Sequence, residues 1–243
     1  MLSLQGIIDV KNIKKTFGKQ DVLKDISLEI PQGEIYGLIG PSGSGKTTLV
    51  KMLLGLESPG SGTIRFKGES LKAGSVYASV GYMAQSDALY TELTAKENLN
   101  FFAALYSLKK KEKEDRIKIV METVDLLDHL HKPVALYSGG MKRRLSLAIA
   151  LLHDPEVLIL DEPTVGIDPV LRKQIWERFQ ELKTKGRTLL ITTHVMDEAE
   201  RCDRLGLLRD GRLLGSEAPA VIKEKYGVSS IEEVFLSTEV NES

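Results

Sequence analysis

The chain has 243 residues, of which 42% are hydrophobic and 28% charged, a composition that can fill a core and excludes overall disorder. Its net charge is −1, from 33 basic against 34 acidic residues, so no strong overall field draws it to nucleic acid, and we expect no nucleic-acid partner. The single cysteine, Cys202, excludes an intrachain disulfide and offers no basis for a zinc cluster.

Neither a signal peptide nor a membrane span is indicated. The first residues, MLSLQGIIDVK, lack a basic segment followed by a long apolar one, so we expect no secretory signal. The longest apolar runs, such as LAIALL at 147–152, fall far short of the roughly 20 residues needed to cross a bilayer. We therefore expect a chain that is soluble on its own.

Short strands dominate the first part of the chain. The segments IIDVKNI and VLKDISLEI, broken by FGKQD and PQGE, predict antiparallel strands within the first 35 or so residues. Three later runs are almost continuously apolar, as in parallel strands buried on both faces: EIYGLI at 34–39, VLIL at 157–160 and TLLIT at 188–192. Helical patterns follow these runs, so we expect an α/β fold with a mostly parallel sheet.

A helix-rich insert is predicted between these strands, over roughly residues 86–153. Thr94 and Glu97 form a capping-box pattern that should begin its first helix. The apolar stripe of that helix comprises Leu99, Phe102, Ala103 and Tyr106. A second stripe comprises Ile117, Val120, Met121, Val124 and Leu127. The run KKKEKEDR at 109–116 mixes charges, which is typical of a solvated face.

A phosphate-binding loop is predicted at residues 40–47. GPSGSGKT fits G-x-x-x-x-G-K-[ST], follows the strand EIYGLI and leads into the helical segment TTLVKMLLG. Lys46 can reach the β- and γ-phosphates, and the Thr47 hydroxyl can bind Mg²⁺. An ordinary glycine-rich turn is the alternative, but this match arises by chance in roughly one chain in a hundred of this length. The predicted nucleotide-binding residues here are Gly40, Pro41, Ser42, Gly43, Ser44, Gly45, Lys46, Thr47 and Thr48.

Polar residues that suit hydrolysis follow the other apolar strands. In a phosphate-loop fold, Asp161 is placed to hold Mg²⁺ and Glu162 to orient or deprotonate the attacking water. TLLIT ends in Thr193 and His194, and VGYMAQ ends in Gln85, a further ligand for the metal or the water. The alternatives are two exposed loop acids and a structural histidine. Because ligands of open α/β sheets bind at the carboxyl ends of the strands, we expect these groups to converge on one nucleotide.

A second motif suited to an anion stands at residues 137–144, YSGGMKRR. Ser138 is a natural N-cap of a helix whose apolar stripe comprises Met141, Leu145, Ala148, Ile149 and Leu152. Capping explains the serine but not Gly139 and Gly140, since a glycine costs a helix up to about 1 kcal/mol relative to alanine. Close approach of the backbone to a ligand would explain both glycines.

In content and in order, these motifs resemble those of the ATP-binding cassette (ABC) proteins along nearly the whole chain. The matching elements are Phe17, GPSGSGKT, Gln85, SGG at 138–140, LILDEPT at 158–164, GIDP at 166–169 and His194. The resemblance implies that ATP and Mg²⁺ bind and that Phe17 stacks on the adenine. It also implies that Lys46, Gln85, Glu162 and His194 serve catalysis, that Thr47, Gln85 and Asp161 bind the metal, and that Asp168 links two nucleotide sites.

The resemblance further implies a single nucleotide-binding domain over residues 1–243. Residues 1–85 and 154–221 would form a RecA-like phosphate-loop core with an N-terminal antiparallel β-subdomain. Residues 86–153 would form an inserted helical subdomain, and residues 222–243 a short C-terminal extension. Ser138, Gly139 and Gly140 would bind the ATP of a second nucleotide-binding subunit, identical or different, across a two-fold dimer.

The segments YSGGMKRRLSLA and SIEEVFLS resemble those of the cytosolic subunits of short bacterial exporters. Such a subunit lies in the cytoplasm, bound peripherally to the inner face of the cell membrane through a separate integral membrane permease. Relatives of this kind export drugs, sodium, lipids or polysaccharides, so the transported substrate stays open.

The sequence departs from the family pattern at a few positions. The usual signature is LSGGQ, whereas this chain has Tyr137 and Met141 at its ends, and VGIDP has Val165 and Ile167 where Ser and Leu are commoner. We therefore expect the central serine and glycines to make the ligand contacts that the resemblance implies. We make no such prediction for the two flanking side chains.

Two other functions stay open at this point. A soluble cassette ATPase of translation or repair is disfavoured, because such relatives carry two cassettes or a long coiled coil, and only about ninety residues separate Lys46 from Ser138 here. A nucleotide-dependent regulatory module without turnover is disfavoured because it would not need Glu162 and His194.

Overall fold

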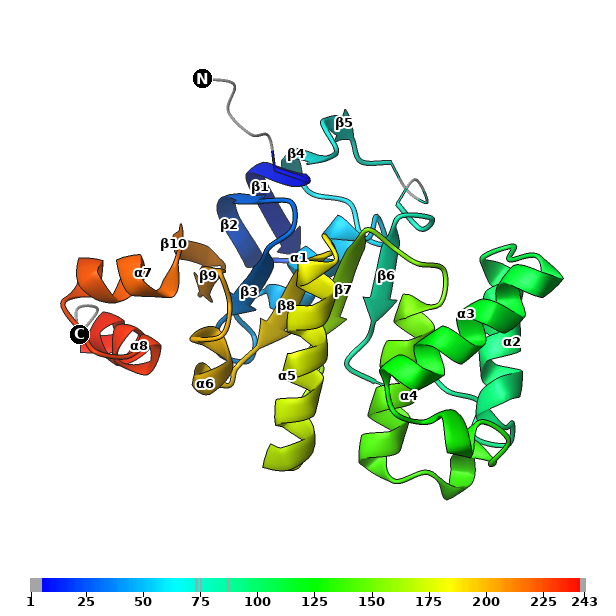
Figure 1. Ribbon diagram of the computed structural model, residues 1–243. Helices are drawn as coiled ribbons and strands as arrows, with labels where there is room; N and C mark the ends of the chain where they lie inside the picture. Colours follow the sequence, from blue (N-terminus) through cyan, green and yellow to red (C-terminus); the bar gives the residue numbers. More distant parts are fainter. Residues whose placement is uncertain (1–5, 73, 75, 87, 241–243) are drawn as a thin grey trace. The chain divides into compact units, whose positions relative to one another are not determined.

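The computed structural model describes residues 6–72, 74, 76–86 and 88–240 and is drawn in Figure 1. The chain forms two compact units, one of Met1–Val76 with Leu190–Ser243 and the other of Tyr77–Leu189. It passes from the second unit back into the first within the strand β8 (Thr188–Thr193).

An antiparallel sheet forms one part of the first unit. Its strands stand in the order β2-β1-β4-β5, with β1 at Ile8–Phe17, β2 at Gln20–Ile30, β4 at Ser61–Phe66 and β5 at Glu69–Ser70. Ile8 of β1 lies opposite Ile30 of β2, and Phe17 lies opposite Gln20. The buried faces of these strands carry alternating isoleucine, valine and leucine side chains. The antiparallel strands predicted from the sequence are confirmed.

A second group of strands in the first unit positions the phosphate loop. Their order is β10-β9-β3-β8, with β3 at Ile35–Ile39, β9 at Arg204–Arg209 and β10 at Arg212–Glu217. The strand β3 runs parallel to β9, with Tyr36 opposite Arg204. All five residues of β3 are buried, as its apolar sequence predicts. The helices of this unit are α1 at Lys46–Leu53, α6 at Met196–Ala199, α7 at Pro219–Tyr226 and α8 at Ile231–Val240.

The second unit combines two parallel strands with most of the helices. The strand β6 (Val80–Met83) pairs in parallel with β7 (Val157–Asp161), with Val80 opposite Val157 and Met83 opposite Leu160. The helices are α2 at Ala95–Leu105, α3 at Lys110–Thr123, α4 at Gly139–Leu151 and α5 at Pro169–Thr184, with short 3₁₀ turns η1 at Leu127–His129 and η2 at Val134–Leu136. The α/β class is confirmed, and the subdomain boundaries drawn from the sequence stay a prediction.

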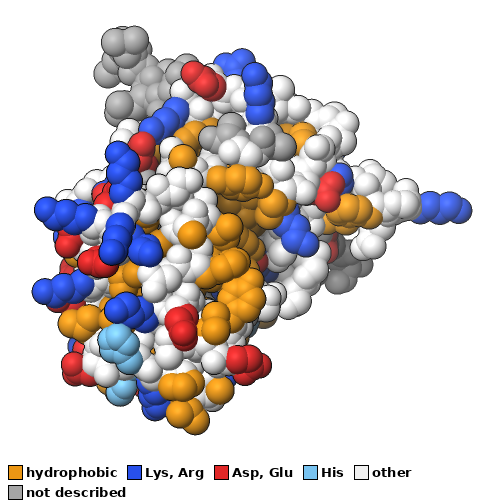
Figure 2. Space-filling model, turned by 90° about the vertical axis from the view of Figure 1, so that its right-hand side faces the viewer, with side chains coloured by type: hydrophobic (Ala, Val, Ile, Leu, Met, Phe, Trp, Pro, Cys, Tyr) orange, Lys and Arg blue, Asp and Glu red, His pale blue; other side chains and the backbone are white. Residues whose placement is uncertain are grey.

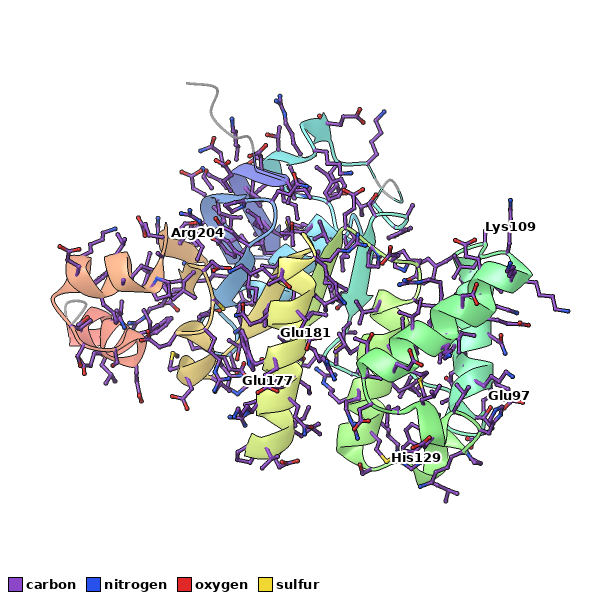
Figure 3. The ribbon with its side chains drawn as sticks, in the orientation of Figure 1. Glu97, Lys109, His129, Glu177, Glu181 and Arg204 are labelled. Atoms are coloured by element: carbon purple, nitrogen blue, oxygen red, sulfur yellow. The ribbon has the colours of Figure 1, made fainter. Side chains whose placement is uncertain are left out.

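The capping box predicted at the start of α2 is present. The Thr94 hydroxyl accepts a hydrogen bond from the Glu97 N–H at 3.2 Å, and the Glu97 carboxylate accepts one from the Thr94 N–H at 2.8 Å. The hydrogen bond from the Thr94 backbone lowers the pKa of Glu97. Figure 3 shows Glu97 at this end of the helix, where a carboxylate also complements the positive helix end.

The helix α3 differs from its predicted extent. It begins at Lys110, so the charged run forms its first turns, and it ends at Thr123, so Val124 and Leu127 of the predicted stripe lie outside the helix. Asp125 has a φ of 54°, a left-handed conformation that stops the helix. The buried residues within the helix are Ile117, Val120 and Met121. The predicted stripe identified the buried face of α3 correctly but extended past the end of the helix.

The described helices were also compared with the thickness of a bilayer. Within residues 6–72, 74, 76–86 and 88–240, none is both long enough and apolar enough to cross a membrane.

We predict that Thr94→Ala lowers the free energy of unfolding by about 1 kcal/mol, the usual contribution of an N-cap side chain. Urea unfolding followed by circular dichroism measures this change. Thr123→Ala is the matched control, because the Thr123 hydroxyl only donates to the Ile119 carbonyl on an exposed surface, and we expect a change within about 0.5 kcal/mol. Equal losses in the two variants would contradict the capping role.

Candidate active site

The phosphate loop lies between β3 and α1 in the first unit. Gly43 and Gly45 have φ values of 80° and 106°, which side-chain-bearing residues rarely adopt. The Lys46 ammonium is buried in the loop and donates to the Gly40 carbonyl at 2.7 Å and the Pro41 carbonyl at 3.0 Å. The loop therefore curls around its own lysine.

Several features of this loop fit a phosphate group. Ser44 is 3% exposed, and its hydroxyl oxygen has no hydrogen-bond partner among the described residues. The first turn of α1 contains no acidic residue, so the positive end of the helix is available to an anion. Pro41, Ser42 and Thr47 are exposed and Thr48 is half-buried. These observations fit the predicted binding of nucleotide phosphates.

Phe17, predicted to stack on adenine, is the last residue of β1. Its ring is 48% exposed, and the Lys15 ammonium lies 4.9 Å from the ring centroid. The ring is therefore not packed in the core. Its contact with a base stays a prediction.

The predicted acidic pair lies at the end of β7 in the second unit. Asp161 is the last residue of the strand and is 2% exposed, and the half-buried Glu162 follows it. Glu162 has a φ of 50°, an uncommon conformation for a residue with a side chain. Burial, with the Asp161 charge as a smaller cause, raises the pKa of Tyr82 on β6.

Gln85 lies close to Glu162, as expected for two members of one site. The strand β6 ends at Met83, so Gln85 belongs to the bend that follows and not to the strand itself. Its side-chain amide donates to the Glu162 carboxylate at 2.8 Å. The structure thus brings together two predicted site residues that stand 77 positions apart. Metal binding by Gln85 stays a prediction.

His194 follows β8 in the first unit and is exposed. The turn that carries it is fixed by its neighbour Thr193, whose hydroxyl donates to the buried Glu198 carboxylate at 2.7 Å and accepts from the Val195 N–H at 3.0 Å. A rigid turn with an exposed imidazole suits a group that contacts a ligand. Convergence of His194 with the other strand ends stays a prediction.

The serine and glycines of YSGGM begin α4, as predicted. The Ser138 hydroxyl accepts from the Met141 N–H at 3.2 Å and so caps the helix. Ser138 and Gly139 are exposed, and a Cβ atom added to Gly139 would meet no atom within 4 Å. Neither packing within the chain nor a left-handed backbone requires glycine at position 139. Close approach of a ligand to this glycine stays a prediction.

The two unusual signature positions have different environments. Tyr137 is 5% exposed and its hydroxyl donates to the His129 carbonyl at 2.8 Å, near the His129 side chain labelled in Figure 3. Burial raises the pKa of this phenol. Met141 is half-buried. Tyr137 therefore stabilises this segment from inside.

Asp168, predicted to belong to a linking loop, caps α5. Its carboxylate accepts from the Val170 and Leu171 N–H groups, both at 3.0 Å. Two residues before it differ from the family pattern. Ile167 is 6% exposed and Val165 is 41% exposed. The linking role of Asp168 stays a prediction.

The two arginines of YSGGMKRR bind main-chain carbonyls of the protein itself. Arg143 is 7% exposed and donates to main-chain carbonyls, and Arg144 donates to the carbonyls of Val124 and Asp125 at 3.1 and 3.0 Å. The sequence reasoning missed Arg143, because its acceptors lie up to 59 positions away and no local pattern identifies them.

The metal prediction was tested against the donor groups present. Among the described residues, no group of three or more His, Cys, Asp or Glu side chains could hold a metal ion by itself. Magnesium differs from zinc in this respect, because it uses one or two carboxylates, water and substrate phosphates. Thr47 in the first unit and Asp161 in the second each have an oxygen donor of the kind that magnesium prefers. Binding of one magnesium ion by both residues stays a prediction.

Comparison with known protein families identifies the class of this protein. A family model described as "ABC transporter" matches residues 23–165, more than half of the chain. The chain belongs to the ABC transporter family. It is accordingly an ATP-binding subunit of an ABC transporter and an ATPase, as predicted.

Individual ABC proteins agree with this assignment. The "Nod factor export ATP-binding protein I" of Burkholderia lata is 44% identical over 93% of this chain and 75% of that protein, and its Sinorhizobium fredii counterpart is 43% identical over 93% and 67%. Among solved structures, an ATP-binding subunit of an ABC transporter matches with a TM-score of 0.86 and 32% identity, over 95% of this chain and 98% of that one. The cbiO1 protein from Clostridium perfringens, part of the ABC transporter complex cbiONQ, matches with a TM-score of 0.83 and 27% identity, over 97% and 95%. The prediction of an ATP-binding subunit of an ABC transporter is confirmed.

We predict that Gly139→Ala lowers ATPase turnover about tenfold or more while the protein stays at least as stable. The added methyl group meets open space within the chain and improves helix propensity by up to about 1 kcal/mol, so only an approaching ligand opposes it. Turnover and the urea midpoint are measured on the same preparation. Parental turnover in this variant would show that no ligand approaches Gly139 closely.

Proposed function

We propose that Glu162 orients or deprotonates the water that attacks the γ-phosphate of ATP. The observation that carries this proposal is the local geometry of Glu162. Its backbone is left-handed and its carboxylate is held by the Gln85 side chain, so the carboxylate has a fixed position at the end of a buried strand. A positioned carboxylate is a suitable general base, and the strained backbone is typical of functional sites.

The other site residues have roles that follow from their own surroundings. Lys46, Ser44 and the backbone N–H groups of residues 42–48 bind the phosphates, and Phe17 offers an exposed ring to the adenine. Thr47 and Asp161 hold Mg²⁺, with Gln85 as a further oxygen ligand. When bound, Mg²⁺ neutralises part of the phosphate charge. His194 offers an imidazole to the γ-phosphate from a fixed turn.

A second nucleotide-binding subunit completes the site in this proposal. Ser138, Gly139 and Gly140 bind the γ-phosphate of the partner's ATP, because Ser138 caps the helix start and Gly139 leaves open space in front of it. Gly140 also has a packing role, since a Cβ atom there would lie 2.8 Å from Leu171 Cδ2. Two-fold symmetry then provides two equivalent sites. ATP binding joins the subunits, and hydrolysis with phosphate release separates them. Asp168 lies in the loop that connects the two sites.

A separate membrane permease is the second partner that we propose. The region of residues 86–153 exposes large hydrophobic side chains, with Tyr90 48%, Phe101 41% and Leu105 64% exposed. The Tyr90 and Phe101 rings contact each other edge to face at 4.9 Å. Figure 2 views the side of the molecule that carries α2 and shows hydrophobic side chains at the surface among charged ones. Such side chains suit a protein partner.

We further propose that the chain works as a peripheral protein on the cytoplasmic face of the cell membrane, as a single nucleotide-binding domain with the subdomains predicted above. The direction of transport is export, which the printed names of the Nod factor export proteins support. The permease binds on the helical region, and the ATP cycle of the dimer changes the conformation of that permease.

We predict that Glu162→Gln still binds ATP but lowers turnover by about 10² to 10⁴, the usual contribution of a positioned general base. Steady-state phosphate release measures turnover, and equilibrium binding of a fluorescent ATP analogue measures affinity. The matched control is Glu177→Gln on the exposed surface of α5, labelled in Figure 3, for which we expect a change within about two-fold. Turnover near the parental rate in Glu162→Gln would remove the base assignment.

A further inference from the structure

Arg143 makes an unusual set of contacts in the interior of the second unit. Its Nη1 donates to the carbonyls of Ala84 at 3.0 Å and Gln85 at 2.9 Å. Its Nη2 donates to the carbonyls of Asp161 at 2.9 Å and Glu162 at 2.5 Å, and its Nε donates to Pro163 at 3.3 Å. One guanidinium thus binds two chain segments that are far apart in the sequence.

The number of contacts matches the chemistry of arginine. A guanidinium has five N–H donors in a rigid planar fork, and the contacts above give it five carbonyl acceptors. Burial of a charge is costly unless polar groups replace its water, and converging carbonyl dipoles do so here. A lysine ammonium has three donors on one nitrogen and cannot reach both segments in this way.

The two segments are those that carry Gln85 and Glu162, whose side chains are hydrogen-bonded to each other. Arg143 binds the carbonyl of Glu162 itself and those on either side of it, where the backbone takes its left-handed turn with a φ of 50°. Without these contacts, that turn would relax toward commoner backbone conformations. The position of the Glu162 carboxylate therefore depends on Arg143.

Arg143 also belongs to the helix that starts at the signature. It stands on α4, five residues after the N-cap Ser138. A shift of this helix therefore acts on the loop that carries Glu162 through the Arg143 guanidinium. The same helix presents Ser138 and Gly139 at its exposed start and holds the Glu162 loop by a buried side chain.

We propose that Arg143 is a positioning residue for ATP hydrolysis, which holds Glu162 in place and links it to the signature helix. This inference rests on the proposed role of Glu162 as the base. It assigns no contact between Arg143 and the nucleotide. Its effect is on the chemical step and not on ATP affinity.

The test is a double-mutant cycle on turnover. Arg143→Lys keeps the charge but loses the planar fork, and we expect kcat to fall about 10- to 100-fold while KM stays within about two-fold. In the Glu162→Gln background the same substitution should change kcat by no more than about two-fold, because the positioned group is already absent. The melting temperature is measured for each variant.

Arg144→Lys is the matched control, since the neighbouring arginine donates to the carbonyls of Val124 and Asp125, away from Glu162. We expect its kcat within about two-fold of the parent. If Arg143→Lys does not fold, Arg143→Gln, which keeps two N–H donors, is used in the same cycle.

Several outcomes would overturn the inference. One such outcome is an unchanged kcat in the Arg143 variant. Another is a rise in KM that accounts for the whole loss of kcat/KM. The third is an equal loss of kcat with and without Glu162. These results are distinct from failure of the base assignment, which is a parental turnover in Glu162→Gln alone. An equal loss in both backgrounds would leave Glu162 as the base and remove only the positioning by Arg143.

Discussion

Burial of a strand on both faces restricts where polar chemistry can stand in this protein. The strands β3, β7 and β8 are buried along their whole lengths, so a side chain that must contact water or a ligand has to lie at or beyond a strand end. Gly40, Asp161 and His194 stand at these ends. The loops that follow keep their shapes because buried groups hold them, the Lys46 ammonium in one, Arg143 in another and Thr193 in the third.

Much of this arrangement could be predicted because its signals are local. A continuous apolar run, a capping box and a glycine-rich loop each act within a few residues, and β3, the α2 cap and the Ser138 cap were found where the sequence indicated. The end of α3 and the location of Gln85 beyond its strand were missed, because backbone geometry at single residues decides them. The contacts of Arg143 could not be predicted from the sequence, since its acceptors are main-chain carbonyls that any sequence could supply.

Within the first turn of the signature helix, some residues stabilise the structure and another has no stabilising role. Tyr137 and Ser138 stabilise the turn, one by a buried hydroxyl bonded to the His129 carbonyl and the other as the N-cap. Gly139 has no such role, since a side chain there would point into open space. A residue that is unfavourable for the helix and unnecessary for packing is best explained by something outside the chain. In the proposed dimer, the partner's ATP takes that place.

Mixing two inactive variants tests this claim most directly. Lys46→Ala removes the phosphate-loop lysine, and Ser138→Arg blocks the signature, so each variant alone should hydrolyse ATP slowly. A mixed dimer contains one site with an intact phosphate loop and an intact signature, and random pairing should restore about one quarter of the parental turnover. Turnover of the mixture equal to the mean of the two separate rates, at concentrations where the parent is dimeric, would contradict a site shared between subunits.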